Sequence, residues 1–430
     1  MASIAPLTPL RYRLDRPPHS LATLVAPPYD VISSDERAHL VASSPNNVVE
    51  LILPGGEGDA KYDHAAALLA DWIATGVLAR DDEPAFYRYD QTFASPSAPS
   101  SAKITRRGFL ALVRLAPFSD RIVLPHERTL SGPKEDRLKL FRATRTNLSP
   151  GFMLYRDPAY ALNSALAAAA PLTEFSTHDG VKHALAKVTD RDAVRAIISH
   201  VATSTLLIAD GHHRYETALH YRDEVSAKHP NAPQDAEFRY FMAFLTNADD
   251  PNLVVFPTHR LIHSLAKFSF ADLLRLAAGA FQVTPLDKAI DADSIEKLLA
   301  KADAFGPSVV AASAEGTALL TFRQSAGATR DPDVVVLHSA ILERLLGITP
   351  EAQAAKTNIL YRQDSRSALA SVRSGGADVL FLMNPTRVAQ VQEIAEKGGV
   401  MPQKSTFFYP KVLTGLTIHT LDPHRRVASV

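Results

Sequence analysis

Apolar residues along the chain occur in short continuous runs that alternate with amphipathic stretches. The runs at residues 206–209, 238–247 and 379–383 predict buried strands, because a strand covered on both faces loses the alternation of apolar and polar positions. Strands are also expected at residues 21–25, 46–54, 85–91, 106–115, 122–124, 149–155, 253–256, 308–312, 318–323 and 359–362, and helices at 33–42, 59–75, 138–147, 162–170, 192–200, 212–224, 270–280, 295–302, 334–346, 365–374 and 388–396. This mixture predicts a mixed α/β (α+β) protein.

The pattern changes at about residue 267, where amphipathic helices begin to alternate with apolar strands. We therefore expect two domains, residues 1–265 and residues 266–430, the second an α/β domain. A chain of 430 residues is long enough for each to bury its own core. Residues 95–101, rich in Ser, Pro and Ala, are expected to form a surface hairpin loop.

Composition narrows the classes of function. The 46 basic and 46 acidic residues cancel, so no overall charge favours duplex nucleic acid, and we expect no nucleic-acid partner. Cysteine is absent, which excludes disulfides, thiol nucleophiles and cysteine-ligated metals. The sequence has neither an apolar run of about 18 residues nor a signal-peptide pattern at its start, so we expect no membrane partner and a cytoplasmic protein. Composition leaves the oligomeric state open.

The densest polar cluster follows the apolar run at residues 206–209. Asp210 and Gly211 end the expected strand, and His212, His213 and Arg214 lie on the first turn of the helix that follows. A helix N-terminus offers backbone N–H groups and a positive dipole end to an anion, arginine adds a bidentate donor, and glycine permits close approach. The structural alternative is a tight turn capped by Asp210 with solvated histidines. The density of the cluster favours a phosphate-handling site.

Two other apolar runs end in similar clusters. Residues 122–124 precede His126, Glu127 and Arg128, and residues 253–256 precede His259 and Arg260. Since side chains at strand ends converge on a site in many α/β proteins, three such clusters favour a common site.

Two Pro-framed segments offer further candidates. Tyr29 and Asp30 follow a stiff Pro-Pro loop, where packing and capping at the start of a helix is the alternative interpretation. Lys404 and Ser405 lie in the aromatic segment 401–411 and are candidate phosphate contacts, the alternative being a loop packed on the core.

The motifs together resemble one known family. In order, they are Ala-Pro-Pro-Tyr-Asp-Val at 26–31, Leu-Pro-His-Glu-Arg-Thr at 124–129, Ala-Asp-Gly-His-His-Arg-Tyr at 209–215, Pro-Thr-His-Arg at 257–260 and Met-Pro-Gln-Lys-Ser-Thr-Phe at 401–407. This series resembles the domain-of-unknown-function family numbered one thousand and fifteen. Its Asp-Gly-His-His-Arg element is similar to the phosphate-binding signature of the ParB/sulfiredoxin superfamily, which includes free serine kinases, CTP-binding partition proteins and sulfiredoxins.

The resemblance implies a ParB/sulfiredoxin-like catalytic core followed by a second α/β domain. It also implies a nucleotide-dependent kinase that transfers a phosphoryl group from ATP or ADP to the hydroxyl of free serine or a similar small metabolite, with Mg²⁺. In this hypothesis Asp210, Gly211, Arg214, Lys404 and Ser405 bind the nucleotide, and Asp210 contacts the metal. Glu127 is the base, with Asp30 the second choice, and His212 and His213 donate to the developing charge. The substrate contacts are then Tyr29, Asp30, His126, Arg128, His259 and Arg260.

Two alternatives stay open. A metal-dependent phosphatase or hydrolase would use His126, His212, His213 and His259 as ligands, although adjacent helical residues point about 100° apart. A non-catalytic nucleotide-binding regulatory protein would resemble the partition proteins, although the zero net charge argues against DNA as its target. No Gly-x-x-x-x-Gly-Lys-Ser/Thr loop occurs, which excludes a Walker-type kinase.

Overall fold

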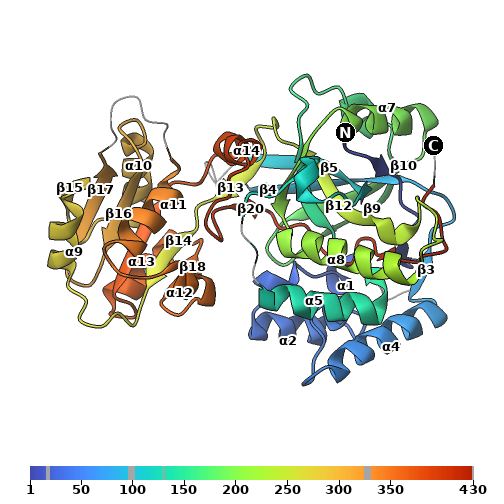
Figure 1. The fold of residues 1–430 in the computed structure, drawn as a ribbon, viewed down its shortest axis with the longest axis horizontal. Coiled ribbons are helices and arrows are strands. Elements are labelled where there is room, and N and C mark those ends of the chain that lie inside the picture. The colour runs from blue at the N-terminus through green and yellow to red at the C-terminus, as the bar shows by residue number, and fades with distance from the viewer. Residues whose placement is uncertain (16–19, 95–101, 128, 130, 324–330, 429–430) are drawn as a thin grey trace. The chain divides into compact units, whose positions relative to one another are not determined.

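A computed structural model describes the chain except for residues 16–19, 95–101, 128, 130, 324–330 and 429–430 (Figure 1). The loop expected at 95–101 and the candidate Arg128 thus lie outside the described residues. Two compact units are present. The first unit comprises Met1–Pro125, Thr129–Val254 and Pro410–Val430, and the second comprises His126–Arg128 and Val255–Tyr409.

The first unit contains a mixed nine-stranded sheet and several helices. Its elements are β1 (Ile4–Ala5), β2 (Leu10–Tyr12), α1 (Leu21–Leu24), η1 (Tyr29–Val31), α2 (Ser34–Ser43), α3 (Val49–Ile52), α4 (Ala60–Ala74), β3 (Leu78–Arg80), β4 (Phe86–Ala94), β5 (Lys103–Arg114), η2 (Phe118–Asp120), β6 (Val123–Leu124), α5 (Ser131–Thr144), β7 (Thr146–Asn147), β8 (Gly151–Tyr155), α6 (Asn163–Ala167), β9 (Ala170–Ser176), β10 (Lys182–Val188), α7 (Arg191–Ala202), β11 (Leu206–Asp210), α8 (His212–Lys228), η3 (Glu237–Arg239), β12 (Tyr240–Asn247) and β21 (His419–Thr420).

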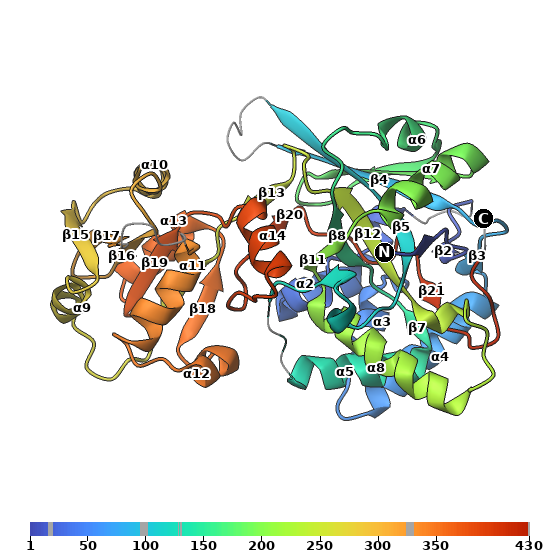
Figure 2. The same cartoon turned by 45° about the horizontal axis from the view of Figure 1, so that its top comes forward.

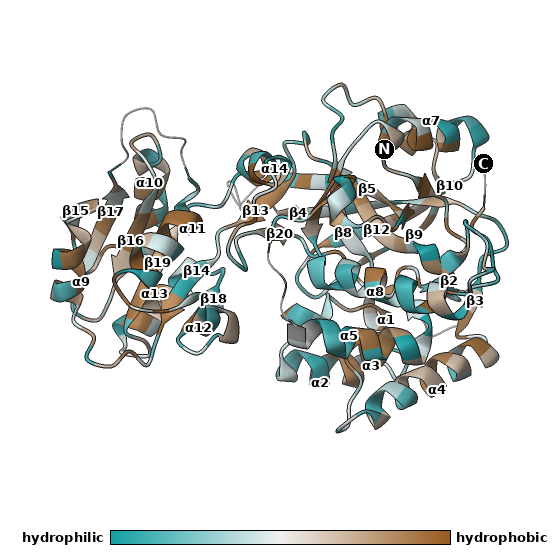
Figure 3. Ribbon diagram, in the orientation of Figure 1, coloured by the Kyte–Doolittle hydropathy of each residue, from teal (hydrophilic) through white to brown (hydrophobic). Residues whose placement is uncertain are grey.

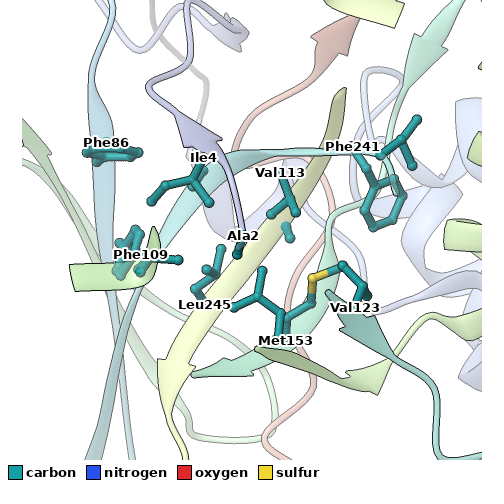
Figure 4. Close-up of a cluster of buried hydrophobic side chains, with 14 of the residues drawn as sticks. Ala2, Ile4, Phe86, Phe109, Val113, Val123, Met153, Phe241 and Leu245 are labelled. Carbon is teal, nitrogen blue, oxygen red and sulfur yellow. The ribbon is translucent and has the colours of Figure 1, made fainter. Parts of the chain in front are cut away.

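The strand order of this sheet is β6-β11-β8-β12-β5-β4-β10-β9, with β1 also paired to β5. The pairs β11–β6 and β12–β8 are parallel and the others antiparallel, so the sheet is mixed. All eight residues of β12 are buried, as its continuous apolar sequence predicts. Figure 4 shows side chains of the core cluster to which the sheet contributes, among them Phe109 of β5, Met153 of β8 and Phe241 of β12.

Three helices of the first unit, α4, α5 and α8, lie side by side, with α5 in the middle (Figures 1 and 2). Hydrophobic residues recur along α4 (Figure 3), and Tyr62, Leu69 and Trp72 are buried. The helix ends where the sequence predicts, because Gly76 adopts a left-handed φ of 75° just beyond it.

The second unit contains a six-stranded antiparallel sheet in the order β15-β17-β16-β19-β14-β18. Its elements are β13 (Val254–Phe256), which begins at the boundary, β14 (His259–Ile262), α9 (Phe270–Ala277), β15 (Phe281–Leu286), α10 (Ala292–Ala302), β16 (Ser308–Ala312), β17 (Thr317–Phe322), α11 (Asp333–Val336), the π-helix η4 (Leu337–Glu343), α12 (Pro350–Ala355), β18 (Ile359–Arg362), α13 (Ser365–Arg373), β19 (Val379–Met383), α14 (Val388–Glu396) and β20 (Phe407–Tyr409).

Helices cover both faces of this sheet. Along β19, Val379 and Phe381 join the cluster beneath α9, α11 and η4, whereas Leu380 and Leu382 join the cluster beneath α10 and α13. A strand with both faces buried has no polar side, which explains its unbroken apolar sequence. The mixed α/β class with a second α/β part is therefore confirmed.

Two strands expected from the sequence are wrong. Residues 21–25 contain helix α1, whose N-cap Ser20 accepts a hydrogen bond from Ala22 N, and residues 46–54 contain helix α3. Asn47 joins the two, since its side chain accepts from Val49 N at 2.9 Å and donates to the carbonyls of Thr23 and Val25. The sequence expectations also miss several strands, among them β9, β10, β14 and β15, because exposed or mixed patterns such as that of β9 resemble loops.

The boundary expected at 265/266 differs from the division between the compact units, which falls between Val254 and Val255. The reason is pairing: β14 lies between β18 and β19 in the second sheet. The tail from Pro410 belongs to the first unit. Among the helices within the described ranges, none is both long and apolar enough to cross a membrane.

Candidate functional site

The turn between β11 and α8 is built around Gly211. This residue is the N-cap of α8 and has a left-handed φ of 94°, a conformation that favours glycine. A Cβ atom at this position would lie 3.1 Å from three atoms of the Arg214 guanidinium group. Glycine therefore allows Arg214 to fold back over the turn, and the side chain of Asp210 is left to pair with it rather than to cap the helix.

Arg214 and Asp210 form the charged centre of this turn. Arg214 is 5% exposed, and it donates to Asp210 Oδ2 at 3.1 Å and to the carbonyl oxygen of Pro150. Asp210 is half-buried, and its Oδ1 lies 3.8 Å from Lys411 Nζ. The carboxylate thus lies between two cations at the start of a helix. An incoming anion would meet those cations and the positive end of the helix dipole.

A second arginine, Arg137, reaches the same region through Tyr29. Its guanidinium carbon lies 4.1 Å from the centre of the Tyr29 ring. Burial raises the pKa of Tyr29 above its ordinary value and the Asp30 carboxylate raises it further, whereas Arg137 and Arg214 lower it. Asp30, Arg137 and Arg214 therefore all act on one hydroxyl group.

The space beside these side chains is small. Tyr29, Arg137, Arg214, Asn147 and Ser149 are among the residues that line a pocket of about 20 Å³. That volume is enough for one water molecule. The pocket can serve as a subsite for a single polar group and not as the place of a whole nucleotide.

Lys411 was not predicted from the sequence. Its backbone is held by two distant residues, since Gln91 Nε2 donates to Lys411 O at 2.9 Å and Arg106 donates to Pro410 O at 2.6 Å. Arg106 also donates to Gln91, and it packs over the ring of Phe152. Burial lowers the pKa of Arg106 to about 10. No local sequence signal at 410–411 reveals this arrangement, because its partners lie about 300 residues earlier.

The two histidines of the motif differ in exposure. His212 is 6% exposed, whereas His213 is half-buried on the same first turn of α8. Glu216, one turn further, accepts from Thr129 Oγ1 and Lys134 Nζ, both at 2.8 Å, which ties α5 to α8. In the part of the chain that the structure describes, no three His, Cys, Asp or Glu side chains group as ligands of a metal ion.

The second unit gathers a different set of candidates around the loop at 401–406. Glu127 accepts the backbone N–H groups of Lys404 at 3.3 Å and Ser405 at 3.0 Å. The Nε2 atom of His126 lies 3.7 Å from Glu127 and 3.0 Å from Thr406 Oγ1. Hydrogen bonds to a carboxylate stabilise its charged form, so Glu127 is held as an anchor for this loop.

Arg260 anchors the same loop from beneath. It is fully buried, and it donates to the carbonyls of Gln403 at 3.3 Å and Lys404 at 3.1 Å and to His338 at 3.2 Å. Burial lowers the pKa of Arg260 to about 10. These contacts direct the guanidinium group inward, to the chain itself.

His259 precedes Arg260 on β14 and is fully buried as well. Its Nδ1 accepts from Met383 N at 3.3 Å, and its Nε2 has no hydrogen-bond partner among the described residues. Burial, followed by the charge of Arg260, lowers the pKa of His259 to about 4. His259 is therefore neutral near pH 7.

The candidates thus fall into two groups, one in each unit. Tyr29, Asp30 and the Asp210–Arg214 turn belong to the first unit, together with Arg137 and Lys411. The other group lies in the second unit and comprises His126, Glu127, His259, Arg260, Lys404 and Ser405. The first group offers cations to a ligand, whereas the contacts of the second group are largely internal.

The fold and the turn define a mixed α/β protein with a cationic strand-to-helix turn. The chain belongs to the family described as Protein of unknown function (DUF1015), whose model matches residues 4–367. Among curated proteins, nothing matches this chain.

Several solved structures overlap the chain at low similarity. A conserved hypothetical protein from Pyrococcus furiosus is 15% identical over 68% of this chain and 89% of its own, with a TM-score of 0.35. A free serine kinase in complex with AMP is 13% identical over 67% and 83%, with a TM-score of 0.34. C-terminally truncated SbnI from Staphylococcus aureus is 9% identical over 72% and 87%, also at 0.34. At these TM-scores, the overlaps support no statement about function.

Proposed function

We propose that this protein is a nucleotide-dependent small-molecule kinase that transfers a phosphoryl group from ATP or ADP to the hydroxyl of free serine or a similar metabolite. The observation that carries the proposal is the Gly211 turn, where buried Arg214 folds over the start of α8 beside Asp210. The turn has the sequence that resembles a phosphate-binding signature, and it has the charges that phosphate oxygens require.

The chemistry is mostly a matter of position and charge. The substrate hydroxyl oxygen forms a bond to the terminal phosphorus of the nucleotide, the bond from that phosphorus to its bridging oxygen breaks, and ADP or AMP leaves. Arg214 and Lys411 would bind phosphate oxygens, and His212 or His213 would donate to the charge that develops on them. These residues all lie at or beside the turn in the first unit.

The hydroxyl proton needs an acceptor, and we assign that role to Asp30. Asp30 is exposed, and its charge acts on Tyr29 together with that of Arg214. Glu127, the first choice from the sequence, accepts two backbone N–H groups. Because its carboxylate is occupied by the backbone of Lys404 and Ser405, we assign Glu127 to shaping the loop at 401–406.

Mg²⁺ would accompany the nucleotide and neutralise charge on the phosphoryl group. Asp210 is the carboxylate of the turn, half-buried and shared with Arg214 and Lys411. One carboxylate with phosphate oxygens and water is a usual ligand set for Mg²⁺, so Asp210 fits this part.

The test uses the full chain with ATP or ADP, Mg²⁺ and a panel of hydroxylated amino acids. We expect a product heavier by one phosphoryl group in the mass spectrum. Arg214→Lys should weaken nucleotide binding about 10- to 100-fold, because a charge-assisted hydrogen bond contributes roughly 1.5–3 kcal/mol. The control is Arg222→Lys on the same helix, whose ion-pair partner is Asp223.

Two outcomes would contradict the proposal. Nucleotide binding without a phosphorylated product would favour the regulatory protein, and the kinase would be abandoned. Unchanged nucleotide affinity in Arg214→Lys would remove the Gly211 turn from the binding site.

A further inference from the structure

The first unit contains a second, much larger cavity away from the Gly211 turn. It is a partly open cavity of about 720 Å³, lined by parts of α4, α5 and α8 and by residues 420–424 of the tail. Binding sites for small molecules in proteins span roughly 300–1,000 Å³. None of the residues described as lining it belongs to the Asp210–Arg214 segment.

One wall of this cavity is apolar. Ala66, Leu69, Ala70 and Ile73 of α4 supply it. Ile73 is 43% exposed, which is high for a large aliphatic side chain. Covering this wall with an apolar group would contribute about 25 cal/mol for each Å² removed from water.

Charged side chains also line the cavity. The lining contains four cations, Arg80, Arg142, Arg145 and Lys228, together with the carboxylates of Glu224 and Asp422, so it is not one uniformly cationic wall. Arg142 is paired with Glu224 at 2.5 Å, and Arg80 with Glu237 at 3.4 Å. In the described part of the chain, no ion pair joins Arg145 or Lys228 to a carboxylate, although the charge of Lys228 acts on the Glu224 carboxyl from one turn away.

A simpler explanation accounts for part of this pattern. Lys228 is in the last turn of α8 and Arg145 follows the end of α5, where a cation is favourable because it complements the helix dipole. That effect needs neither a cavity nor an apolar wall. It also leaves both charges available to a ligand.

We propose that this cavity binds an organic anion that has a dianionic head and an apolar body. Arg145 and Lys228 bind the head, and the face of α4 between Ala66 and Ile73 covers the body. This site is independent of the proposed kinase reaction, and its ligand does not have to be a nucleotide.

The test is calorimetric titration of the full chain with phenyl phosphate and, separately, with inorganic phosphate. We expect phenyl phosphate to bind at least about 10-fold more tightly, because burial of a ring contributes more than the 1.4 kcal/mol that this factor requires. The double variant Arg145→Gln, Lys228→Gln should weaken binding of phenyl phosphate by a similar factor. The matched control is Lys297→Gln, Lys301→Gln, which removes the same charge from exposed positions of α10.

Two further variants make the result decisive. Ala70→Glu places a carboxylate on the apolar wall at an exposed helical position, so it should abolish binding without unfolding the protein. Arg214→Lys should leave phenyl phosphate binding unchanged. The inference is overturned if phenyl phosphate fails to bind, if both phosphates bind equally, or if binding is lost in Arg214→Lys and kept in the double variant.

Discussion

Gly211 is the residue on which the geometry of the candidate site depends. Its φ of 94° is unfavourable for a side chain by about 1–2 kcal/mol, and a Cβ would press on the Arg214 guanidinium group. We predict that Gly211→Ala lowers the free energy of unfolding by this amount and also weakens nucleotide binding. Urea unfolding and calorimetry measure the two effects.

Gly180→Ala is the matched control for Gly211→Ala. Gly180 also has a positive φ, 78°, but nothing lies within 4 Å of an added Cβ. It should show the loss of stability alone. Equal nucleotide affinity in the two variants would contradict a role for the Gly211 turn.

Substitutions of Asp30 and Glu127 distinguish the two candidates for the general base. Asp30→Asn should lower kcat about 10²- to 10⁴-fold with little change in KM, and it should remove the acid limb of the pH–rate profile. Glu127→Gln should mainly lower stability, because it weakens the acceptor of the Lys404 and Ser405 N–H groups. Steady-state kinetics of both variants over a pH series test this assignment. If Glu127→Gln lowers kcat and removes the acid limb while Asp30→Asn does not, Glu127 is the base.

Local sequence predicts some residues of the site and not others. Asp210, Gly211 and Arg214 could be found because strand, turn and helix follow one another within a few positions. Lys411 could not be found, since Gln91 and Arg106 hold its backbone from strands β4 and β5. The sequence places Arg260 at a substrate as a prediction, and it does not reveal that Arg260 is buried at a strand end and donates to loop carbonyls.

At the scale of elements, Asn47 holds two short helices together. Its fully buried side chain makes hydrogen bonds to Thr23 O, Val25 O and Val49 N. Asn47→Ala would leave Val25 O and Val49 N without the Asn47 side chain as a partner, at about 1–3 kcal/mol each, whereas Thr23 O keeps a hydrogen bond from Ser43 Oγ. We predict a loss of roughly 2 kcal/mol or more in urea unfolding.

The neighbouring Asn46 provides the control for Asn47→Ala. Asn46 is less buried, and it bonds through its backbone, accepting from Tyr12 Oη and donating to Ser44 Oγ. Asn46→Ala should therefore change stability by less than about 0.5 kcal/mol. Similar losses in both variants would show that the side chain of Asn47 does not join α1 to α3.

Asn47 also shows why some helices were predicted as strands from the sequence. Short apolar runs fit a strand or a buried helix equally well, and residues 48–53, apolar except for Glu50, are such a run. The side chain of Asn47 accepts a hydrogen bond from Val49 N at the start of α3, a contact that favours the helix and that the apolar pattern does not reveal. By contrast, Leu206–Asp210 was predicted correctly, because Gly211 marks its end and a long amphipathic helix follows.

At the scale of the whole molecule, four buried histidines link stability to pH. Burial lowers the pKa of His183, His259 and His419 to about 4 and that of His338 to about 3. The histidines of the unfolded chain have pKa values near 6.5, so between pH 6.5 and pH 4 the unfolded chain binds more protons than the folded protein. Stability is therefore fully present above about pH 7 and falls as the pH drops from 6.5 toward 4, by about 1.4 kcal/mol per pH unit for each histidine.

The carboxyl group of Glu237 changes the free energy of unfolding with pH in the opposite direction. Burial raises the pKa of Glu237, so the folded protein gains protons there as the pH falls and gains stability. A single carboxyl cannot offset four histidines, so the free energy of unfolding still rises with pH.

We predict that the urea midpoint falls steeply from pH 6.5 to pH 4.5 and is flat from pH 7 to pH 8. His419→Gln should reduce the slope by about 1.4 kcal/mol per pH unit, whereas His64→Gln, at an exposed position of α4, should leave it unchanged. A midpoint independent of pH in wild type would mean that these histidines can bind protons without unfolding, and the cores around them would then have to open to water locally.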